Sequence, residues 1–362
     1  MRLLHALTRP VLHALDPEDA HRLAIQMLKM APLPAAPRDD PRLSVRAFGL
    51  SFPNPVGMAA GFDKDAEAAD ALLRLGFGFV EVGTITPLPQ AGNPRPRLFR
   101  LDADAAVINR LGFNSGGADA ALRRLAARAG RSGIVGVNVG ANKDSPDRIV
   151  DYVGLIERFA PVASYITLNI SSPNTPGLRA MQSAAVLDDL LARVIDARER
   201  AVRQAGPTPV LLKIAPDLSL NDLDDVVGIA RSRRADGMIV GNTTVARPKG
   251  LRESAAREAG GLSGRPLKPL ANRMLAETFV RVEGVFPLIG TGGIDCGEAA
   301  VAKIRAGASL LQLYSALVFR GLGLVAEIKQ ALLAALERER QDSIKSMTGI
   351  DAAAVTAEPW PD

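Results

Sequence analysis

Short apolar runs that alternate with longer helical patterns dominate the sequence from Pro55 onward. The candidate strands are residues 55–60, 77–83, 133–139, 164–170, 209–215, 236–242, 286–292 and 308–314. Strands separated by helices in this way predict βαβ units and a parallel sheet. Eight such units favour an α/β fold of the (βα)8 TIM-barrel type over a doubly wound sheet.

Polar and glycine residues gather where these runs end, in AAGFDK, EVGTIT, NVGANK, NISSPN, LKIAPD, VGNTT, GTGGI and LYS. In a (βα)8 barrel the carboxyl ends of the strands all open on one face, and that face carries the active site. The sequence therefore predicts a single functional mouth.

Residues outside the barrel pattern define two further segments. Residues 1–42 are predicted to form a small N-terminal helical extension and a proline-rich linker, and residues 43–340 form the barrel domain. Apolar residues fall on one helical face at Leu3, Leu4, Leu7, Val11, Leu12 and Leu15, with a break at Pro10. A second amphipathic helix follows Asp16, its candidate N-cap, with Pro17 at the first helical position. The tail, residues 341–362, is predicted to be loosely ordered.

Composition excludes several functions. The net charge of +5 is spread over 362 residues and offers no basic stripe for nucleic acid. The single cysteine, Cys296, excludes an intramolecular disulfide, and the three histidines all lie within the first 21 residues. A metal site and a Ser-His-Asp hydrolase are therefore not expected. The chain has no apolar run of 18 residues, so no membrane span is predicted.

The stretch GTGGI, residues 290–294, follows a predicted strand and precedes a helix. Its glycines allow backbone N–H groups to approach a phosphate, and LYSAL after the next strand completes the phosphate site common in such barrels. A tight turn without a ligand is the alternative interpretation.

Lys64 and Lys213 lie at or near strand ends, and Lys213 follows four apolar residues. A buried lysine needs an anionic partner, which a reduced flavin would supply. An ion pair with Asp63, Asp65 or Asp217 is the alternative.

Five asparagines are expected at the same mouth: Asn109, Asn138, Asn169, Asn174 and Asn242. Each could be a turn residue, but together their amides suit a planar ligand rich in C=O and N–H groups.

Several long stretches resemble one known family. AAGFDKD, EVGTITPLPQAGNPRPRLFR, INRLGFNS, NISSPNTPGLR, VGNTT, ARPKGL, GGLSGRPL, GTGGI and QLYSALVF, in this order from about His21 to Ala326, are similar to the membrane-associated, quinone-dependent (class 2) dihydroorotate dehydrogenases. The N-terminal helical extension is also similar to that class, since the soluble class 1 enzymes lack it.

The resemblance implies binding residues at matching positions. Flavin mononucleotide (FMN) would be held by Ala60, Gly61, Phe62, Asp63, Lys64, Thr84, Asn138, Asn169, Lys213, Gly241, Gly264, Gly293, Tyr314 and Ser315. Dihydroorotate would be held by Lys64, Asn109, Arg110, Leu111, Gly112, Phe113, Asn169, Asn174, Asn242 and Thr243. One departure is Gly241, where the family commonly has threonine.

The second serine of NISSPN, Ser172, corresponds to the catalytic base of class 2, whereas class 1 enzymes use a cysteine. A serine without a histidine is a weak base, so it requires a proton relay and electrostatic help. Thr175 and a water held near Phe113 are the candidates for the relay, and Lys64 could stabilise charge on the substrate.

The N-terminal helices of this class form a tunnel for the tail of ubiquinone, and His21, Arg100 and Tyr314 are candidates near the quinone head. The expected protein is a monomeric, peripheral membrane enzyme on the cytoplasmic face of the bacterial inner membrane. It would oxidise (S)-dihydroorotate to orotate in de novo UMP biosynthesis. His21 could instead be a surface or capping residue.

Two other interpretations remain open on the residues alone. Another flavin (βα)8 oxidoreductase, such as a 2-hydroxy acid oxidase, would need a histidine base that the barrel lacks. A peripheral membrane protein with the barrel as scaffold would leave the converging lysine, asparagine and serine residues without a role.

Overall fold

The computed structural model describes residues 12–206 and 208–361. The first predicted helix, from Leu3 to Leu15, lies mostly outside these residues, and so does its predicted break at Pro10.

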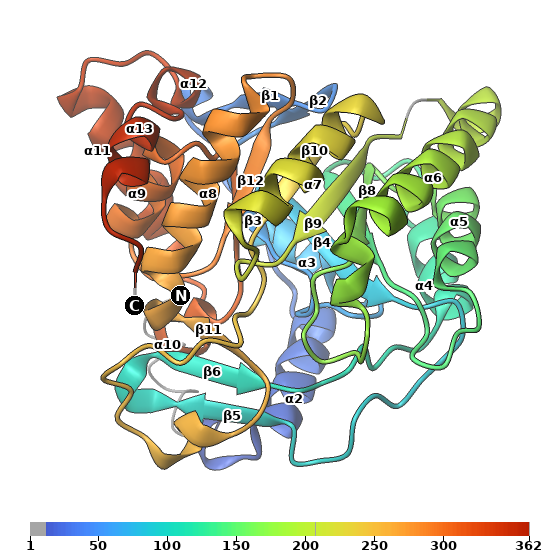
Figure 1. Cartoon of the computed structure of the whole chain (residues 1–362). Coiled ribbons are helices and arrows are strands. Elements are labelled where there is room, and N and C mark those ends of the chain that lie inside the picture. The colour runs from blue at the N-terminus through green and yellow to red at the C-terminus, as the bar shows by residue number, and fades with distance from the viewer. Residues whose placement is uncertain (1–11, 207, 362) are drawn as a thin grey trace.

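Eight parallel strands of the described chain close into a barrel, in the order β10-β12-β13-β3-β4-β7-β8-β9 (Figure 1). They are β3 (Val56–Met58), β4 (Phe79–Ile85), β7 (Ile134–Val139), β8 (Tyr165–Asn169), β9 (Val210–Ile214), β10 (Gly237–Val240), β12 (Leu288–Thr291) and β13 (Leu310–Leu313). Each overlaps one of the eight predicted runs. The (βα)8 prediction is therefore confirmed.

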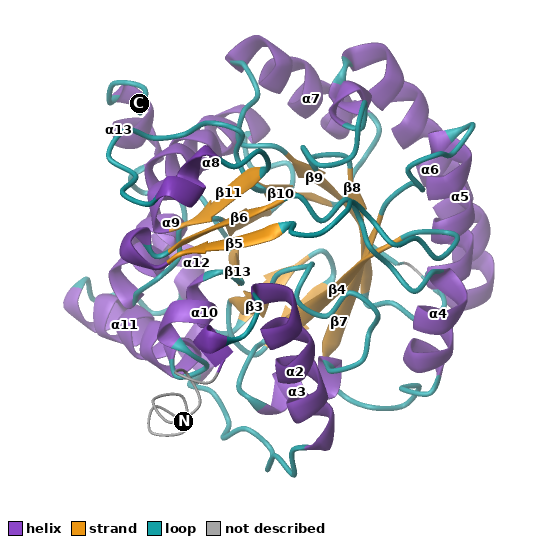
Figure 2. Cartoon of the chain, turned by 90° about the horizontal axis from the view of Figure 1, so that it is seen from below, coloured by secondary structure: helices purple, strands orange, loops and turns teal. Residues whose placement is uncertain are grey.

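The helices form a ring around the strands (Figure 2). They are α3 (Ala69–Arg74), α4 (Ala118–Ala126), α5 (Arg148–Phe159), α6 (Ala184–Ala205), α7 (Leu220–Ser232), α8 (Lys268–Val282), α9 (Gly297–Arg305), α10 (Ala316–Arg320) and α11 (Leu324–Arg338). Strand residues are buried on both faces, because one face fills the barrel and the other packs on this ring.

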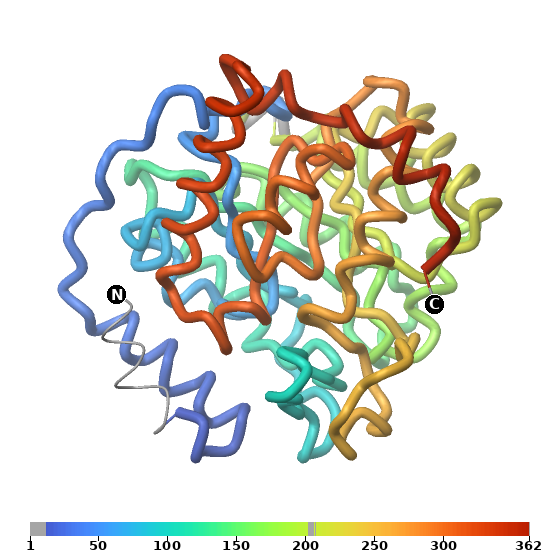
Figure 3. Tube along the Cα trace, turned by 90° about the vertical axis from the view of Figure 1, so that its left-hand side faces the viewer, coloured from blue at the N-terminus to red at the C-terminus, as the bar shows by residue number. Residues whose placement is uncertain are grey.

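A short hairpin, β1 (Val45–Ala47) and β2 (Leu50–Phe52), covers the end of the barrel where the strands begin. Phe52 packs edge-on against Phe79, with ring centroids 5.2 Å apart, and Tyr165 continues this aromatic layer. The extended residues 31–40 run along the side of the barrel and connect this end to the N-terminal helix at the other (Figure 3).

The opposite end, where the strands finish, carries a small antiparallel sheet that the sequence patterns did not predict. It contains β5 (Leu98–Leu101), β6 (Ala106–Asn109) and β11 (Gly261–Gly264), with β6 in the middle. Helix α2 (Pro17–Met30) packs beside β5 (Figure 1). The active-site mouth therefore has a roof made from three separate parts of the chain.

Helix α2 begins as predicted and is fastened by a buried ion pair. The Asp16 carboxylate accepts from the backbone N–H of Glu18 at 2.9 Å, which satisfies a free donor of the first turn. Arg97 binds the Glu18 carboxylate through two nitrogens, at 2.6 and 2.9 Å, and its hydrogen bond lowers the pKa of Glu18. Removing one partner would leave a buried charge without compensation.

The prediction of a loosely ordered tail is wrong for the described residues 341–361. They contain two short helices, α12 (Ile344–Met347) and α13 (Ala352–Ala357). Ile344 and Met347 are fully buried, and Asp351 binds Arg305 at 2.6 Å. These tertiary contacts hold the tail, and they leave no periodic pattern long enough to read in the sequence.

In the described part of the chain, no helix has the length and apolar character needed to cross a membrane.

Glycines in the barrel make room for the aromatic layer, which gives a test of the packing. A Cβ atom on Gly57 would lie 2.2 Å from the ring of Phe79. We expect Gly57→Ala to lower the free energy of unfolding by about 1–3 kcal/mol through overpacking. Gly154→Ala, in α5 with open space at the Cβ position, is the control and should stabilise by about 0.5–1 kcal/mol. Urea denaturation measures both, and equal effects would contradict the packing of this layer.

Candidate active site

A cavity of about 460 Å³ opens between the carboxyl ends of the barrel strands, the small sheet and α2. Most of the residues predicted for the site line it: Ala60, Gly61, Phe62, Lys64, Thr84, Asn109, Leu111, Gly112, Phe113, Asn169, Ser172, Asn174, Lys213, Asn242, Thr243, Gly264, Gly293, Tyr314 and Ser315. The predicted mouth is therefore one connected space that continues beneath α2.

A buried carboxylate organises the polar residues inside the barrel. Glu81 on β4 is fully buried and accepts hydrogen bonds from Asn138 at 2.8 Å and Gln312 at 2.8 Å. It also accepts bonds from the hydroxyls of Tyr165 and Thr167. Burial is the main reason that the pKa of Tyr165 is raised well above its usual value.

This carboxylate fixes the orientation of the amides at the mouth. Because Asn138 donates its N–H to Glu81, its oxygen is free to accept from Thr84 at 2.7 Å and from Asn169 at 3.1 Å. Asn169 also donates to the Thr84 hydroxyl at 2.9 Å. The amide faces presented to the cavity are therefore set by a charge deeper in the barrel.

Both predicted lysines lie at the cavity, and neither has a hydrogen bond or ion pair with a described residue. Burial lowers the pKa of Lys64 to about 8, and the nearby Glu18 carboxylate partly opposes this. Burial also lowers the pKa of Lys213, which is 5% exposed, and the Glu81 carboxylate opposes it. Asp217 is not the partner of Lys213, because it binds Arg179 at 2.8 Å.

The glycine-rich turn after β12 has the close backbone approach that a phosphate site requires. Gly292 and Gly293 have φ values of +93° and +71°, and a Cβ atom on Gly293 would lie 2.3 Å from the Cα of Lys268. Only glycine fits there without strain. The hydroxyls of Ser263 and Ser315 lie 2.6 Å apart on the same side of the cavity.

The loop after β8 brings Ser172 to the cavity with three asparagines. Ser172 is 7% exposed, and its Oγ accepts a bond of 3.3 Å from the backbone N–H of Asn174. The Asn174 side chain donates to Asn109 at 3.1 Å, and Asn242, which follows β10, also lines the cavity. Within residues 12–206 and 208–361, no histidine is hydrogen-bonded to Ser172.

Beneath α2 the walls become mostly apolar. Pro17, Ala20, Ala24, Met27, Leu28, Leu317, Val318 and Leu322 line this part. His21 reaches the Tyr314 hydroxyl at 3.3 Å and packs edge-on against Phe62. Burial lowers the pKa of His21 to about 3, so the imidazole is neutral at physiological pH.

Arg100 also lines this part, but its guanidinium hydrogen-bonds mainly to the backbone of the residues before α2. It donates to the carbonyls of Leu12, His13 and Leu15 at 2.6–3.0 Å. Arg100 therefore holds the segment that leads into the helix, and only its remaining N–H groups face other partners.

Five predicted residues do not line the cavity. Asp63 is buried and accepts the backbone N–H groups of Glu67 and Ala68, so it caps a turn; burial raises its pKa to about 6. Arg110 points away, binding Glu258 at 2.7 Å and lying over the ring of Phe99. Asn138 lies one layer below the mouth.

The other two are Gly241 and Thr175. Gly241 has a φ of +110°, and a Cβ atom there would lie 2.9 Å from the Thr291 carbonyl oxygen, so the local backbone favours the glycine found in this chain. Thr175 is buried, and its hydroxyl has no hydrogen-bond partner among the described residues.

Sequence reasoning missed Glu81 and Arg179. Glu81 interrupts the apolar run FGFVEVG, and a charge inside a buried strand could have marked it. Arg179 ends the quoted stretch NISSPNTPGLR, but nothing in its spacing shows where its side chain points. In the described residues, no group of three or more His, Cys, Asp or Glu residues is placed to hold a metal ion.

Comparison with known proteins gives a consistent assignment. Residues 42–336 match the family model described as Dihydroorotate dehydrogenase. Proteins named dihydroorotate dehydrogenase (quinone) from Bradyrhizobium diazoefficiens and Rhodopseudomonas palustris strain BisA53 are 71% and 68% identical to this chain. The match covers 100% of this chain and 99% and 100% of those proteins.

Solved structures agree. The ligand-free DHODH of Eimeria tenella has a TM-score of 0.88 and 40% identity, over 93% of this chain and 99% of that one. The ferulenol complex of the same enzyme gives the same TM-score and identity, over 96% of its chain. With the closed barrel and its N-terminal helix, these matches show that the chain belongs to the dihydroorotate dehydrogenase family of oxidoreductases, in its quinone-dependent class 2.

Proposed function

We propose that this protein oxidises (S)-dihydroorotate to orotate in de novo pyrimidine biosynthesis, with FMN as hydride acceptor, ubiquinone as final electron acceptor and Ser172 as the base. The observation that carries the proposal is the cavity itself. At one end it holds amide and hydroxyl groups and two lysines that form no ion pair with any described residue, and at the other it continues as an apolar passage under α2. A scaffold protein would have no use for either end.

The residues present fit FMN. Lys213 is a buried cation with no partner among the described residues, so an anionic ligand beside it would compensate its charge. Gly293 and Ser315 offer close backbone and hydroxyl groups for a phosphate. Bound FMN would supply a two-electron carrier that accepts a hydride from the substrate and passes the electrons to the quinone.

Neutral amides suit dihydroorotate, a ring whose C=O and N–H groups alternate along one edge. Asn109, Asn174, Asn242 and Thr243 converge on the cavity and can donate and accept hydrogen bonds with such a ring. Lys64 carries an ammonium group below its pKa of about 8, so it can pair with the substrate's negative charge.

Ser172 would accept the proton that leaves C5 of the substrate. No described histidine is its partner, so the proton must move on. The buried Thr175 hydroxyl, which has no partner among the described residues, is the proposed next acceptor. Phe113, held at a φ of +54° beside Gly140, lines the cavity, and a water beside it is the other proposed member of the relay. The Lys64 ammonium stabilises negative charge that develops on the ring.

The apolar passage under α2 fits the tail of ubiquinone. His21 and Tyr314 are its polar groups, and a neutral His21 can hydrogen-bond a quinone oxygen without adding a charge. Helix α2 also exposes Leu23 and Met30, which suits contact with a lipid surface. We propose that this contact is with the cytoplasmic face of the bacterial inner membrane. That the protein is a monomer stays a prediction.

Replacing the proposed base gives the first test. We expect Ser172→Ala to slow anaerobic bleaching of bound flavin by dihydroorotate by about 100- to 10,000-fold, the usual contribution of a general base. Stopped-flow absorbance measures the rate, and flavin content is determined in parallel. Ser183→Ala removes an exposed hydroxyl of the same segment and should leave the rate unchanged. Equal rates in native protein and Ser172→Ala would remove Ser172 from this role.

The passage under α2 gives a second test. Ala24 lines the passage, whereas Leu23 on the same helix is 40% exposed. We expect Ala24→Trp to fill the passage and to slow reoxidation of the flavin by a long-tailed quinone at least about tenfold, without changing its reduction by dihydroorotate. Leu23→Trp should change neither half-reaction. If Ala24→Trp slowed both half-reactions equally, the assignment of the passage to quinone would fail.

A further inference from the structure

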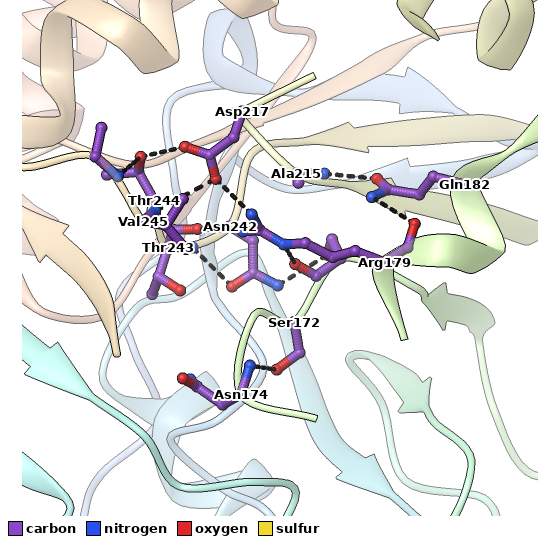
Figure 4. A network of polar contacts seen from close by, with 12 residues as sticks. Ser172, Asn174, Arg179, Gln182, Ala215, Asp217, Asn242, Thr243, Thr244 and Val245 are labelled. Carbon is purple, nitrogen blue, oxygen red and sulfur yellow. Dashed lines mark hydrogen bonds and ion pairs between the residues drawn. The ribbon is translucent and has the colours of Figure 1, made fainter. Parts of the chain in front are cut away.

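One arginine, Arg179, contacts the backbone of the loop that carries Ser172. Arg179 lies in η3 (Arg179–Gln182), the short 3-10 helix that ends this loop. Its Nε donates to the carbonyl oxygen of Ser171 at 3.0 Å, and one terminal nitrogen donates to the carbonyl oxygen of Thr243 at 3.1 Å. The guanidinium therefore joins the residue before Ser172 to a residue at the end of β10 that lines the substrate end of the cavity (Figure 4).

A carboxylate after β9 holds the arginine itself. Asp217 binds the other terminal nitrogen of Arg179 at 2.8 Å. The same carboxylate accepts from the Thr244 hydroxyl and from the backbone N–H of Val245, the two residues after Thr243. Arg179 and Asp217 thus form one unit that spans the ends of β8, β9 and β10 (Figure 4).

Ser171 is held through both its backbone and its side chain. Its carbonyl accepts from Arg179, while its hydroxyl donates to Asn169 at 3.0 Å and accepts from Asn242 at 2.8 Å. Asn169 and Asn242 both line the cavity. The residue directly before Ser172 is therefore fixed at its backbone and its side chain against the groups proposed to hold the substrate.

A second contact anchors η3 to the barrel. The Gln182 side chain accepts from the backbone N–H of Ala215 at 3.1 Å, at the end of β9 (Figure 4). Because Gln182 is 6% exposed and remains bonded without Arg179, η3 would keep its place if the arginine were removed. Loss of Arg179 should therefore loosen the Ser172 loop more than it disturbs the fold.

We propose that Arg179, locked by Asp217, is a positioning residue that sets the Ser172 hydroxyl relative to the substrate held by Asn242 and Thr243. This inference rests on the proposed function. A proton transfer requires its two atoms within hydrogen-bond reach, and a misplacement of about 1 Å can cost about 100-fold in rate. The Arg179–Asp217 pair acts on the rate of proton removal and not on the affinity of the site for its ligand.

The test compares Arg179→Met, Arg179→Lys, Asp217→Asn and the double variant Arg179→Met with Asp217→Asn with the native full-length protein. The control is Arg193→Met, which removes an arginine of α6 that pairs with Asp189 on the outer surface. Each protein is mixed anaerobically with dihydroorotate, and the limiting rate of flavin bleaching is measured separately from the affinity for orotate. Hydrogen–deuterium exchange of residues 168–182 is followed in the substrate-free proteins.

We expect Arg179→Met to lower the limiting rate about 10- to 100-fold and to weaken orotate binding by less than about threefold. Arg179→Lys should recover part of the rate, because an ammonium can replace one of the three contacts. Asp217→Asn should act in the same direction, and the double variant should be no slower than Arg179→Met alone, since the pair acts as a unit. Exchange of residues 168–182 should increase in Arg179→Met and not in Arg193→Met.

An unchanged limiting rate per bound flavin in Arg179→Met would overturn the inference, and so would unchanged exchange of the loop. A role in stability alone would lower flavin content and thermal stability while leaving that rate intact. If the native protein showed no bleaching with dihydroorotate, the proposed function would fall, whereas the exchange comparison would still decide whether Arg179 orders the loop.

Discussion

The Glu81 carboxylate, buried at the centre of the barrel, is the group on which the polar site depends. It takes hydrogen bonds from β7, β8 and β13, and so it joins strands that are far apart in the sequence. Through Asn138 it also determines which way the amide oxygens above it point. A buried carboxylate with several donors is stable there, whereas the same donors without it would be left unpaired.

Buried charges also lie at the mouth of the barrel and in the helix above it. Lys213 faces Glu81 but forms no ion pair with it, so positive charge remains for a ligand. Glu18 on α2 forms an ion pair with Arg97, and the two charges have opposite effects on the pKa of Lys64. The helix that roofs the apolar passage is thus electrostatically connected to the lysine proposed to bind the substrate.

The parts of this structure that could be predicted from sequence are those with local signatures. The eight strands and their polar ends follow from short apolar runs followed by glycine and amide residues, and Asp16 and Pro17 mark the start of α2. The small sheet could not be predicted, because it pairs β6 with β11 from a distant part of the chain. The tail was misjudged for the same reason, since Met347 and Asp351 are held by partners elsewhere.

Side-chain direction was the second limit. Asp217 was considered a partner for Lys213 on spacing alone, yet it binds Arg179, and Arg110 points away from the cavity that its neighbours line. Spacing places a residue at a strand end, but the packing of the surrounding loops decides whether its side chain faces the site. Glu81 shows the opposite case, in which a single charge inside an apolar strand carried information.

The most direct test of the account is an anaerobic two-step titration of the native protein, followed by flavin absorbance. We predict that one equivalent of dihydroorotate bleaches one bound flavin and forms one equivalent of orotate. A quinone added afterwards, with no substrate left, should then restore the oxidised spectrum. Purified protein without FMN, or flavin that dihydroorotate leaves oxidised, would contradict the account.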